Sequence, residues 1–178
     1  SVPSEGWFNS YDDLLAAPQV ESVYIATPHP FHADLVIRAL RAGKHVVVEK
    51  PAGLIPGEVV AMTDVAMETG RFFMEGFMYR CHPQIERLVE LIGNCEIGKV
   101  QHIEASFGFA SNYHPDSRLD NPTLAGGAIL DVGVYPVSLA RLVAGAAQGL
   151  PFAEPLEIQG VGTLGPLGVD ETAYALLK

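Results

Sequence analysis

The sequence has little cysteine and no run of apolar residues as long as a membrane helix. Its two cysteines, Cys81 and Cys95, match neither a disulfide framework nor a C-x-x-C metal motif, so we expect a reducing, cytoplasmic location. A membrane helix needs about 18 consecutive apolar residues, and the start of the chain lacks the basic and apolar blocks of a signal peptide. We therefore expect neither a membrane span nor a secretory signal.

Basic side chains are also scarce. Lys and Arg total 11 against 21 Asp and Glu, which gives a formal charge of -10. Binding of nucleic acid depends on neutralising phosphates, so we expect no nucleic acid partner. The six histidines show no metal-ligand spacing, and we expect no metal. With 48% hydrophobic and 18% charged residues among 178, the chain should fold and bury a core.

The first part of the chain alternates short apolar runs with helical patterns. The order is strand, helix, strand, helix, strand, over residues 23–26, 30–42, 45–48, 57–69 and 72–74. The second run includes three consecutive valines, a pattern typical of parallel strands covered on both faces. We predict an α/β fold in which residues 1–75 form part of a Rossmann-type parallel sheet.

The rhythm changes after residue 76. A helical stripe follows Pro83, and residues 100–109 alternate apolar and polar side chains, which predicts a strand with one buried face. Residues 76–178 are therefore predicted to form an α+β domain with a mixed or antiparallel sheet. The polar loop 110–125 is long for a connection and could border a site.

The glycine turn of a dinucleotide-binding sheet is missing. No G-x-G-x-x-G follows any predicted strand, although such a sheet carries that turn after its first strand. Three parallel strands alone would also leave an open edge. We hypothesise that the chain is part of a longer protein whose first β and α units are absent here.

Three groups of residues stand where chemistry is expected. Thr27 to His32 follow the first strand and Glu49–Lys50–Pro51 follow the second, and ligands of open α/β sheets bind at the carboxyl ends of strands. The prolines could simply end the strand, and His32 could be structural rather than functional. A lysine held in a partly dry pocket can donate to a substrate oxygen and make a neighbouring hydroxyl more acidic.

The third group lies at residues 126–136. Asp131 and Tyr135 are four residues apart and share a face if this segment is helical, whereas Pro136 requires a kink or a helix start there. Tyr135 could instead be a packed tyrosine at a helix end. Arg80 follows the third predicted strand, where it could clamp a cofactor oxygen or bridge to a surface acid.

The stretches 22–32 (SVYIATPHPFH), 39–51 (ALRAGKHVVVEKP) and 126–136 (GGAILDVGVYP) together resemble the Gfo/Idh/MocA family, named for glucose-fructose oxidoreductase, inositol dehydrogenase and rhizopine catabolism. The resemblance runs through nearly the whole chain. Many members have histidine where this chain has Tyr135, and in this respect the chain resembles the branch of the family that contains dihydrodiol dehydrogenase. The family resemblance implies an oxidoreductase that uses NAD or NADP, with a Rossmann domain followed by an α+β domain.

The resemblance also implies roles for individual residues. Tyr135 would be the acid or base, with Lys50 and Asp131 facing the substrate, and Lys50–Pro51 would be a cis peptide. The remaining residues would line the cofactor: Ala26, Thr27, Pro28, His32, Glu49, Lys50 and Arg80. The expected substrate is a sugar, polyol or dihydrodiol, and a homodimer would form through the sheet of the second domain. The alternative is a catalytically inactive relative that binds sugars or dimerises.

Overall fold

The computed structural model describes residues 6–178, which divide into two compact units, one ending at Gly76 and the other beginning at Phe77. The first contains α1 (Tyr11–Ala16), β1 (Ser22–Ile25), α2 (His32–Arg41), β2 (His45–Glu49), α3 (Pro56–Thr69) and β3 (Phe73–Gly76). A 3-10 turn, His29–Phe31, leads into α2.

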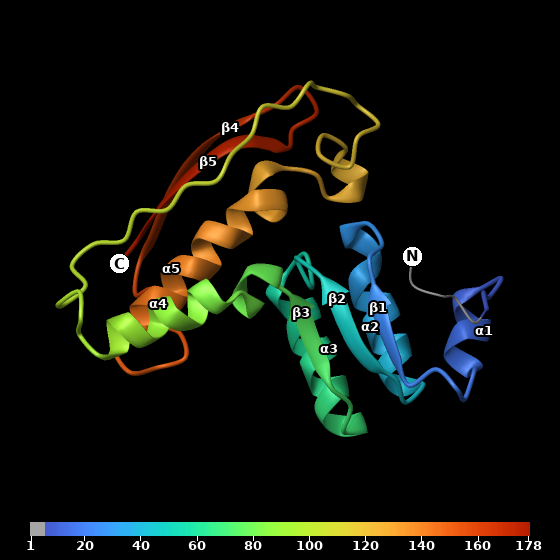
Figure 1. The fold of residues 1–178 in the computed structure, drawn as a ribbon. Coiled ribbons are helices and arrows are strands. Elements are labelled where there is room, and N and C mark those ends of the chain that lie inside the picture. The colour runs from blue at the N-terminus through green and yellow to red at the C-terminus, as the bar shows by residue number, and fades with distance from the viewer. Residues whose placement is uncertain (1–5) are drawn as a thin grey trace. The chain divides into compact units, whose positions relative to one another are not determined.

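The first unit contains a parallel sheet with the strand order β1-β2-β3, as its apolar runs predict. Figure 1 shows α2 and α3 on one side of this sheet. Val46 and Val48 of β2 point into the core there, where Leu40 of α2 and Met62 of α3 are also fully buried. The opposite face carries a row of registered neighbours, Tyr24, Val47 and Met74.

The prediction that this sheet is covered on both faces is wrong for the described residues. Tyr24 and Met74 are exposed, and Val47 is only half-buried. The run of valines indicated apolar side chains at every position, but it could not indicate whether helices within this chain cover both faces.

The second unit is an α+β arrangement. It contains a 3-10 turn (Met78–Cys81), α4 (Pro83–Gly93), a second 3-10 turn (Pro122–Leu124), a π-helical turn (Ile129–Gly133) and α5 (Val134–Ala146). Strands β4 (Ile158–Leu164) and β5 (Asp170–Leu177) follow and pair antiparallel, as Figure 1 shows in red. The parallel sheet and this separate antiparallel sheet confirm the predicted fold class.

The strand predicted at residues 100–109 is wrong. No strand is assigned there, and Phe107 and Phe109 are 53% and 56% exposed. Alternation of apolar and polar residues specifies which side chains share a face, but a strand also needs a hydrogen-bonded partner. Within residues 6–178, the antiparallel ladder of this unit forms between β4 and β5 instead.

One helical stretch, Pro122–Ala146, is long and apolar enough to cross a membrane by length and composition. It is broken into the 3-10 turn, the π-helical turn and α5. A core helix of a water-soluble protein would pass the same test, so this stretch is weak evidence for a span.

Candidate active-site residues in the two units

The turns after β1 and β2 lie at one edge of the parallel sheet. Ile25 and Val48 are partners in the ladder, so Ala26, Thr27 and Pro28 leave β1 beside the point where Glu49 ends β2. The peptide between Lys50 and Pro51 is cis, as the resemblance implied. The structure therefore brings the residues expected from these two motifs to the carboxyl edge of the sheet, where α/β folds bind ligands.

Thr27 has a polar group available to a ligand at this edge. Its hydroxyl oxygen Oγ1 is buried and has no hydrogen-bond partner in the part of the chain that the structure describes. Leaving a buried hydroxyl unpaired costs free energy. The position therefore fits a bound molecule that supplies the missing hydrogen bond, as the cofactor role expected for Thr27 requires.

His32 is fully buried at the start of α2. Its ring atom Nδ1 lies 2.8 Å from the carbonyl oxygen of Pro51, and Nε2 lies 2.8 Å from the carbonyl oxygen of Thr27. Both ring nitrogens are thus engaged by the backbone of the two turns.

Glu49 is held from the neighbouring strand. The Tyr24 phenol donates a hydrogen bond to Glu49 Oε1. This hydrogen bond is the main reason that the pKa of Tyr24 lies above its ordinary value of 10.0, with smaller contributions from desolvation and from the charge of Glu49. Lys50, the next residue, is half-buried.

Two acidic residues that the sequence reasoning missed hold the segment after Pro51. Glu75 Oε1 on β3 accepts a hydrogen bond from the Ala52 amide at 2.8 Å, and Glu58 Oε2 on α3 accepts one from the Leu54 amide at 2.7 Å. The rule that pointed to Glu49 also applies to Glu75, because Glu75 lies near the carboxyl end of a parallel strand. Glu58 had no comparable signal.

In the second unit, Asp131 is buried within the π-helical turn. Arg118 Nη1 of the preceding loop donates to Asp131 Oδ1 at 2.8 Å, and the two side chains are 57% and 8% exposed respectively. A buried carboxylate requires such a charged partner. The long polar loop therefore does border one of the predicted site residues, although the sequence gave no reason to choose Arg118 within it.

Two consecutive glycines allow the loop to approach the π-helical turn. A Cβ at Gly126 would lie 2.5 Å from the Leu119 carbonyl oxygen, which accepts a hydrogen bond from the Gly127 amide at 2.9 Å. Gly127 has a φ of 125°. Asp170 Oδ2 of β5 accepts from the Ile129 amide at 2.6 Å, so it satisfies an otherwise open donor at the start of the turn.

Tyr135 lies among aromatic rings at the start of α5, where Pro136 is tolerated in the first turn. Its ring centroid is 5.7 Å from that of Phe77, 6.1 Å from that of Tyr79 and 5.5 Å from that of Phe107. Such edge-to-face and tilted contacts fix the plane of a ring. The sequence left two interpretations of Tyr135, a packed tyrosine and a phenol positioned for chemistry, and this cluster is compatible with both.

Arg80 has a partner within the second unit. Its Nη2 donates to Ser138 Oγ at 3.2 Å, and the same hydroxyl lies 2.8 Å from the Tyr79 hydroxyl. Ser138 is buried one turn after Tyr135. The contact with a cofactor that we expected of Arg80 stays a prediction.

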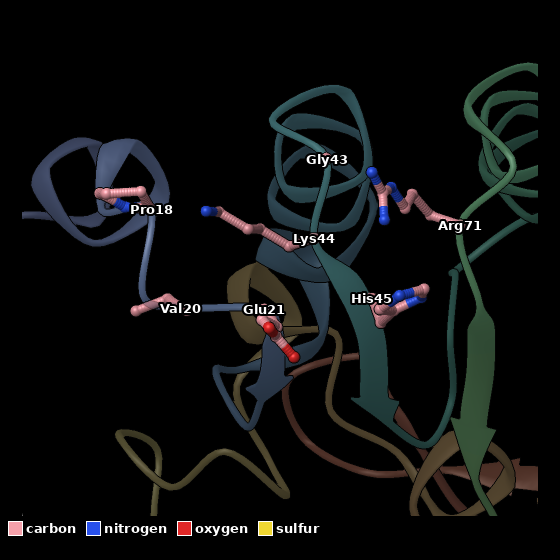
Figure 2. Close-up of a pocket in the computed structure, with 7 residues that line it drawn as sticks. All are labelled: Pro18, Val20, Glu21, Gly43, Lys44, His45 and Arg71. Carbon is pink, nitrogen blue, oxygen red and sulfur yellow. The ribbon is translucent and has the colours of Figure 1, made fainter.

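A cavity of about 380 Å³ lies at the opposite edge of the parallel sheet, where β1, β2 and β3 begin. Figure 2 shows Lys44 extending toward the end of α1 near Pro18, and Arg71 beside Gly43. The buried Lys44 donates from Nζ to the Ala17 carbonyl oxygen at 2.8 Å, which caps the carboxyl end of α1. The buried lysine at this edge thus has a structural role, which is to hold the end of α1.

A smaller cavity of about 220 Å³ reaches Ala26 and Thr27 at the carboxyl edge. It is lined mainly by apolar side chains of α1, β1 and α2, including Leu14, Val23 and Leu35. Among residues 6–178, no three His, Cys, Asp or Glu side chains are placed to hold a metal ion.

Comparisons with known proteins match both units. A family profile described as "Oxidoreductase family, NAD-binding Rossmann fold" matches residues 2–77, and the "GFO/IDH/MocA C-terminal domain" matches residues 85–178. The chain is 38% identical over 171 residues to an uncharacterized oxidoreductase of Rhizobium meliloti and 37% identical over 171 residues to trans-1,2-dihydrobenzene-1,2-diol dehydrogenase of Mus musculus. Each alignment covers 96% of this chain and 49% of the relative.

Solved structures that are similar to this chain also include oxidoreductases. A 3-ketoreductase from Actinomadura kijaniata, in complex with NADP and TDP-benzene, has a TM-score of 0.79 and 33% identity, covering 96% of this chain and 50% of that one. An oxidoreductase domain protein from Kribbella flavida has a TM-score of 0.80 and 30% identity, covering 95% and 48%. The chain thus spans about half the length of the relatives that it matches.

Proposed function

This chain belongs to the Gfo/Idh/MocA oxidoreductase family, and from that membership we propose that the protein containing it is an NAD- or NADP-dependent oxidoreductase. Its substrate would be a sugar, polyol or dihydrodiol, which would react at a hydroxyl-bearing carbon. The observation that carries this proposal is that family profiles match both units while Lys50, Asp131 and Tyr135 are all present. Relatives named as a dihydrodiol dehydrogenase and a D-xylose dehydrogenase support the substrate class.

The carboxyl edge of the parallel sheet fits the nicotinamide end of such a cofactor. The buried Thr27 hydroxyl requires a partner there, and Glu49 and Lys50 end the neighbouring strand. The pyrophosphate, in contrast, is normally bound by a glycine turn and a helix N-terminus. The G-x-G-x-x-G of this sequence, at residues 160–165, runs along β4 of the antiparallel ladder and does not follow a strand of the parallel sheet. We expect residues 1–178 alone to bind the dinucleotide poorly.

The reaction divides between cofactor and side chains. When bound, the nicotinamide supplies or takes the hydride. We assign to Tyr135 the proton transfer at the substrate hydroxyl oxygen. The phenolate form of tyrosine is the base, but little of it is present near neutral pH because the ordinary pKa of the phenol is about 10. An ammonium close by favours the phenolate. We assign that part to Lys50.

We assign to Asp131 a hydrogen bond from a substrate hydroxyl, which holds the reacting carbon in place. Its carboxylate can remain charged in a buried position because the Arg118 guanidinium compensates it. Glu49 and Arg80 are proposed to contact the cofactor. Tyr135 is suited to a positioned proton transfer because its ring plane is fixed by Phe77, Tyr79 and Phe107.

The test is a redox screen of the protein against sugars, polyols and dihydrodiols with NAD and NADP. On the best substrate, Tyr135→Phe and Lys50→Met should each lower kcat by at least about a hundredfold, within the usual range for a placed acid or base. The exposed residues Tyr174 and Lys99 provide the matched controls Tyr174→Phe and Lys99→Met, which should not change kcat. Near-normal turnover in Tyr135→Phe would remove the phenol from the mechanism.

A further inference from the structure

His32 lies between the two turns that end β1 and β2. Its imidazole is 0% exposed, and its two nitrogens each lie 2.8 Å from a backbone carbonyl oxygen, that of Pro51 and that of Thr27. The two carbonyls are 24 residues apart in the chain, one in each turn. The ring is therefore a link between the turns.

The chemistry of the link follows from its acceptors. A carbonyl oxygen only accepts hydrogen bonds, so each contact needs a proton on the facing nitrogen. The imidazolium form makes both bonds, and either neutral tautomer makes one. In every form, the nitrogens face protein carbonyls, so His32 has no ring nitrogen left for a cofactor.

We propose that His32 is a positioning residue that joins the Thr27 carbonyl to the Pro51 carbonyl and thereby fixes Lys50 relative to the turn after β1. This differs from the direct contact with the cofactor that the family resemblance implied, and it agrees with the structural role that the sequence alone left open. The proposal rests on the proposed function for what this edge does, whereas the link itself does not depend on any activity.

The surroundings of Pro51 explain why one more link matters. The Ala52 amide is held by Glu75 and the Leu54 amide by Glu58, so the segment after Pro51 is attached to β3 and α3. Only His32 is seen to attach the Pro51 carbonyl to the turn after β1 in the described part of the chain. Without the imidazole, the carbonyl of this buried residue would lose that donor.

Three substitutions separate the two contacts. In His32→Asn, the side-chain amide nitrogen occupies roughly the place of Nδ1 and can donate to the Pro51 carbonyl. In His32→Gln, it occupies roughly the place of Nε2 and can donate to the Thr27 carbonyl. His32→Leu removes both contacts. The exposed His102 gives the control His102→Gln.

The assay measures kcat and the cofactor KM of the complete protein, together with the cofactor Kd by fluorescence titration. We expect His32→Leu to lower kcat and weaken cofactor binding, each by about tenfold or more, the change that loss of one well-formed hydrogen bond can produce. His32→Asn should preserve kcat better, because it retains the contact next to Lys50. His32→Gln should preserve the cofactor KM and Kd better, because it retains the contact at Thr27.

The outcomes separate this inference from the proposed function. If the wild-type protein neither turns over nor binds a dinucleotide, the proposed function fails. NMR of the chain's imidazole N–H groups then still tests the link, which predicts slowly exchanging protons on both His32 ring nitrogens; a proton on only one of them would overturn it. If the wild type is active and His32→Leu has unchanged kcat and Kd, the inference is overturned. Should His32→Leu not fold, equal kcat and equal Kd in the Asn and Gln variants overturn it instead.

Discussion

Substitution of Gly127 by alanine should destabilise the second unit, because two separate features of that position require glycine. Its φ of 125° lies where side chains are rarely tolerated, and such strain costs on the order of 1–3 kcal/mol. An added Cβ would also lie 2.2 Å from Asp170 Oδ1. The other oxygen of that carboxylate accepts the Ile129 amide at 2.6 Å, so Asp170 cannot move away without breaking this bond.

The second contribution can be estimated from that hydrogen bond. Its loss at the start of the π-helical turn should cost about 1–2 kcal/mol, as for a helix cap. With the backbone strain, Gly127→Ala should lower the free energy of unfolding by about 3 kcal/mol. Asp170→Ala alone removes only the hydrogen bond and should cost about 1.5 kcal/mol.

A double-mutant cycle tests this reasoning by urea unfolding followed by circular dichroism. Once Asp170 is alanine, the new Cβ has no carboxylate to displace, so the double variant should be destabilised by roughly 1.5 kcal/mol less than the sum of the single variants. Gly126→Ala is the matched control. Its Cβ would meet the backbone carbonyl of Leu119, which Asp170→Ala does not remove, so this second pair should be additive.

Additive energies for Gly127→Ala and Asp170→Ala would refute the explanation, because they would show that the glycine is not needed to make room beside Asp170. The same cycle measured as kcat in the complete protein would show whether the turn places Asp131 for the reaction. In that assay, Gly127→Ala should lower kcat, because the π-helical turn that begins just after Gly127 contains Asp131.

The remaining predictions concern two charged contacts. Arg118→Met should lower the free energy of unfolding by about 1–3 kcal/mol, between the values for exposed and buried ion pairs, because Asp131 is buried and Arg118 is half-exposed. In urea unfolding, Arg118→Lys should restore part of the lost stability. An unchanged unfolding midpoint in Arg118→Met would show that the Arg118–Asp131 ion pair does not stabilise the fold. The Tyr24 phenol should titrate above its ordinary pKa of 10.0, because Glu49 accepts its hydrogen bond. A raised pKa in the folded state means that this contact stabilises the fold below pH 10 and that the stabilisation is lost as the pH rises through the raised pKa. Ultraviolet absorbance of wild type minus Tyr24→Phe measures the titration, and Glu49→Gln should lower the pKa; a Tyr24 that titrates at 10.0 or below would be inconsistent with it.

The parallel unit was predictable in large part because its information is local. Apolar runs separated by helical patterns predicted the three strands, and Thr27, Glu49 and Lys50 lie at the carboxyl edge of the sheet as predicted. Their roles toward a ligand stay predictions. The cis peptide came from the resemblance and is present. The exposed second face, with Tyr24 and Met74, could not be predicted, because an apolar strand does not report what covers it.

The second unit was harder because its contacts join residues that no local pattern connects. Residues 100–109 alternate like a strand, but the ladder forms between β4 and β5, where glycines at 160 and 162 weaken the strand pattern. The pairing of Arg118 with Asp131 spans 13 residues, and neither charge alone indicates it. The four-residue spacing of Asp131 and Tyr135 was interpreted as helical, whereas Asp131 lies in a π-helical turn.

A common cause explains which polar residues were misjudged or missed. His32, Glu58, Glu75 and Asp170 each bind a backbone carbonyl or amide next to a motif rather than another side chain. Sequence reasoning looks for side chains that act on ligands, and backbone groups are the same at every position, so such partners leave no mark in the sequence. Their substitution should therefore displace a turn without removing a group that touches substrate.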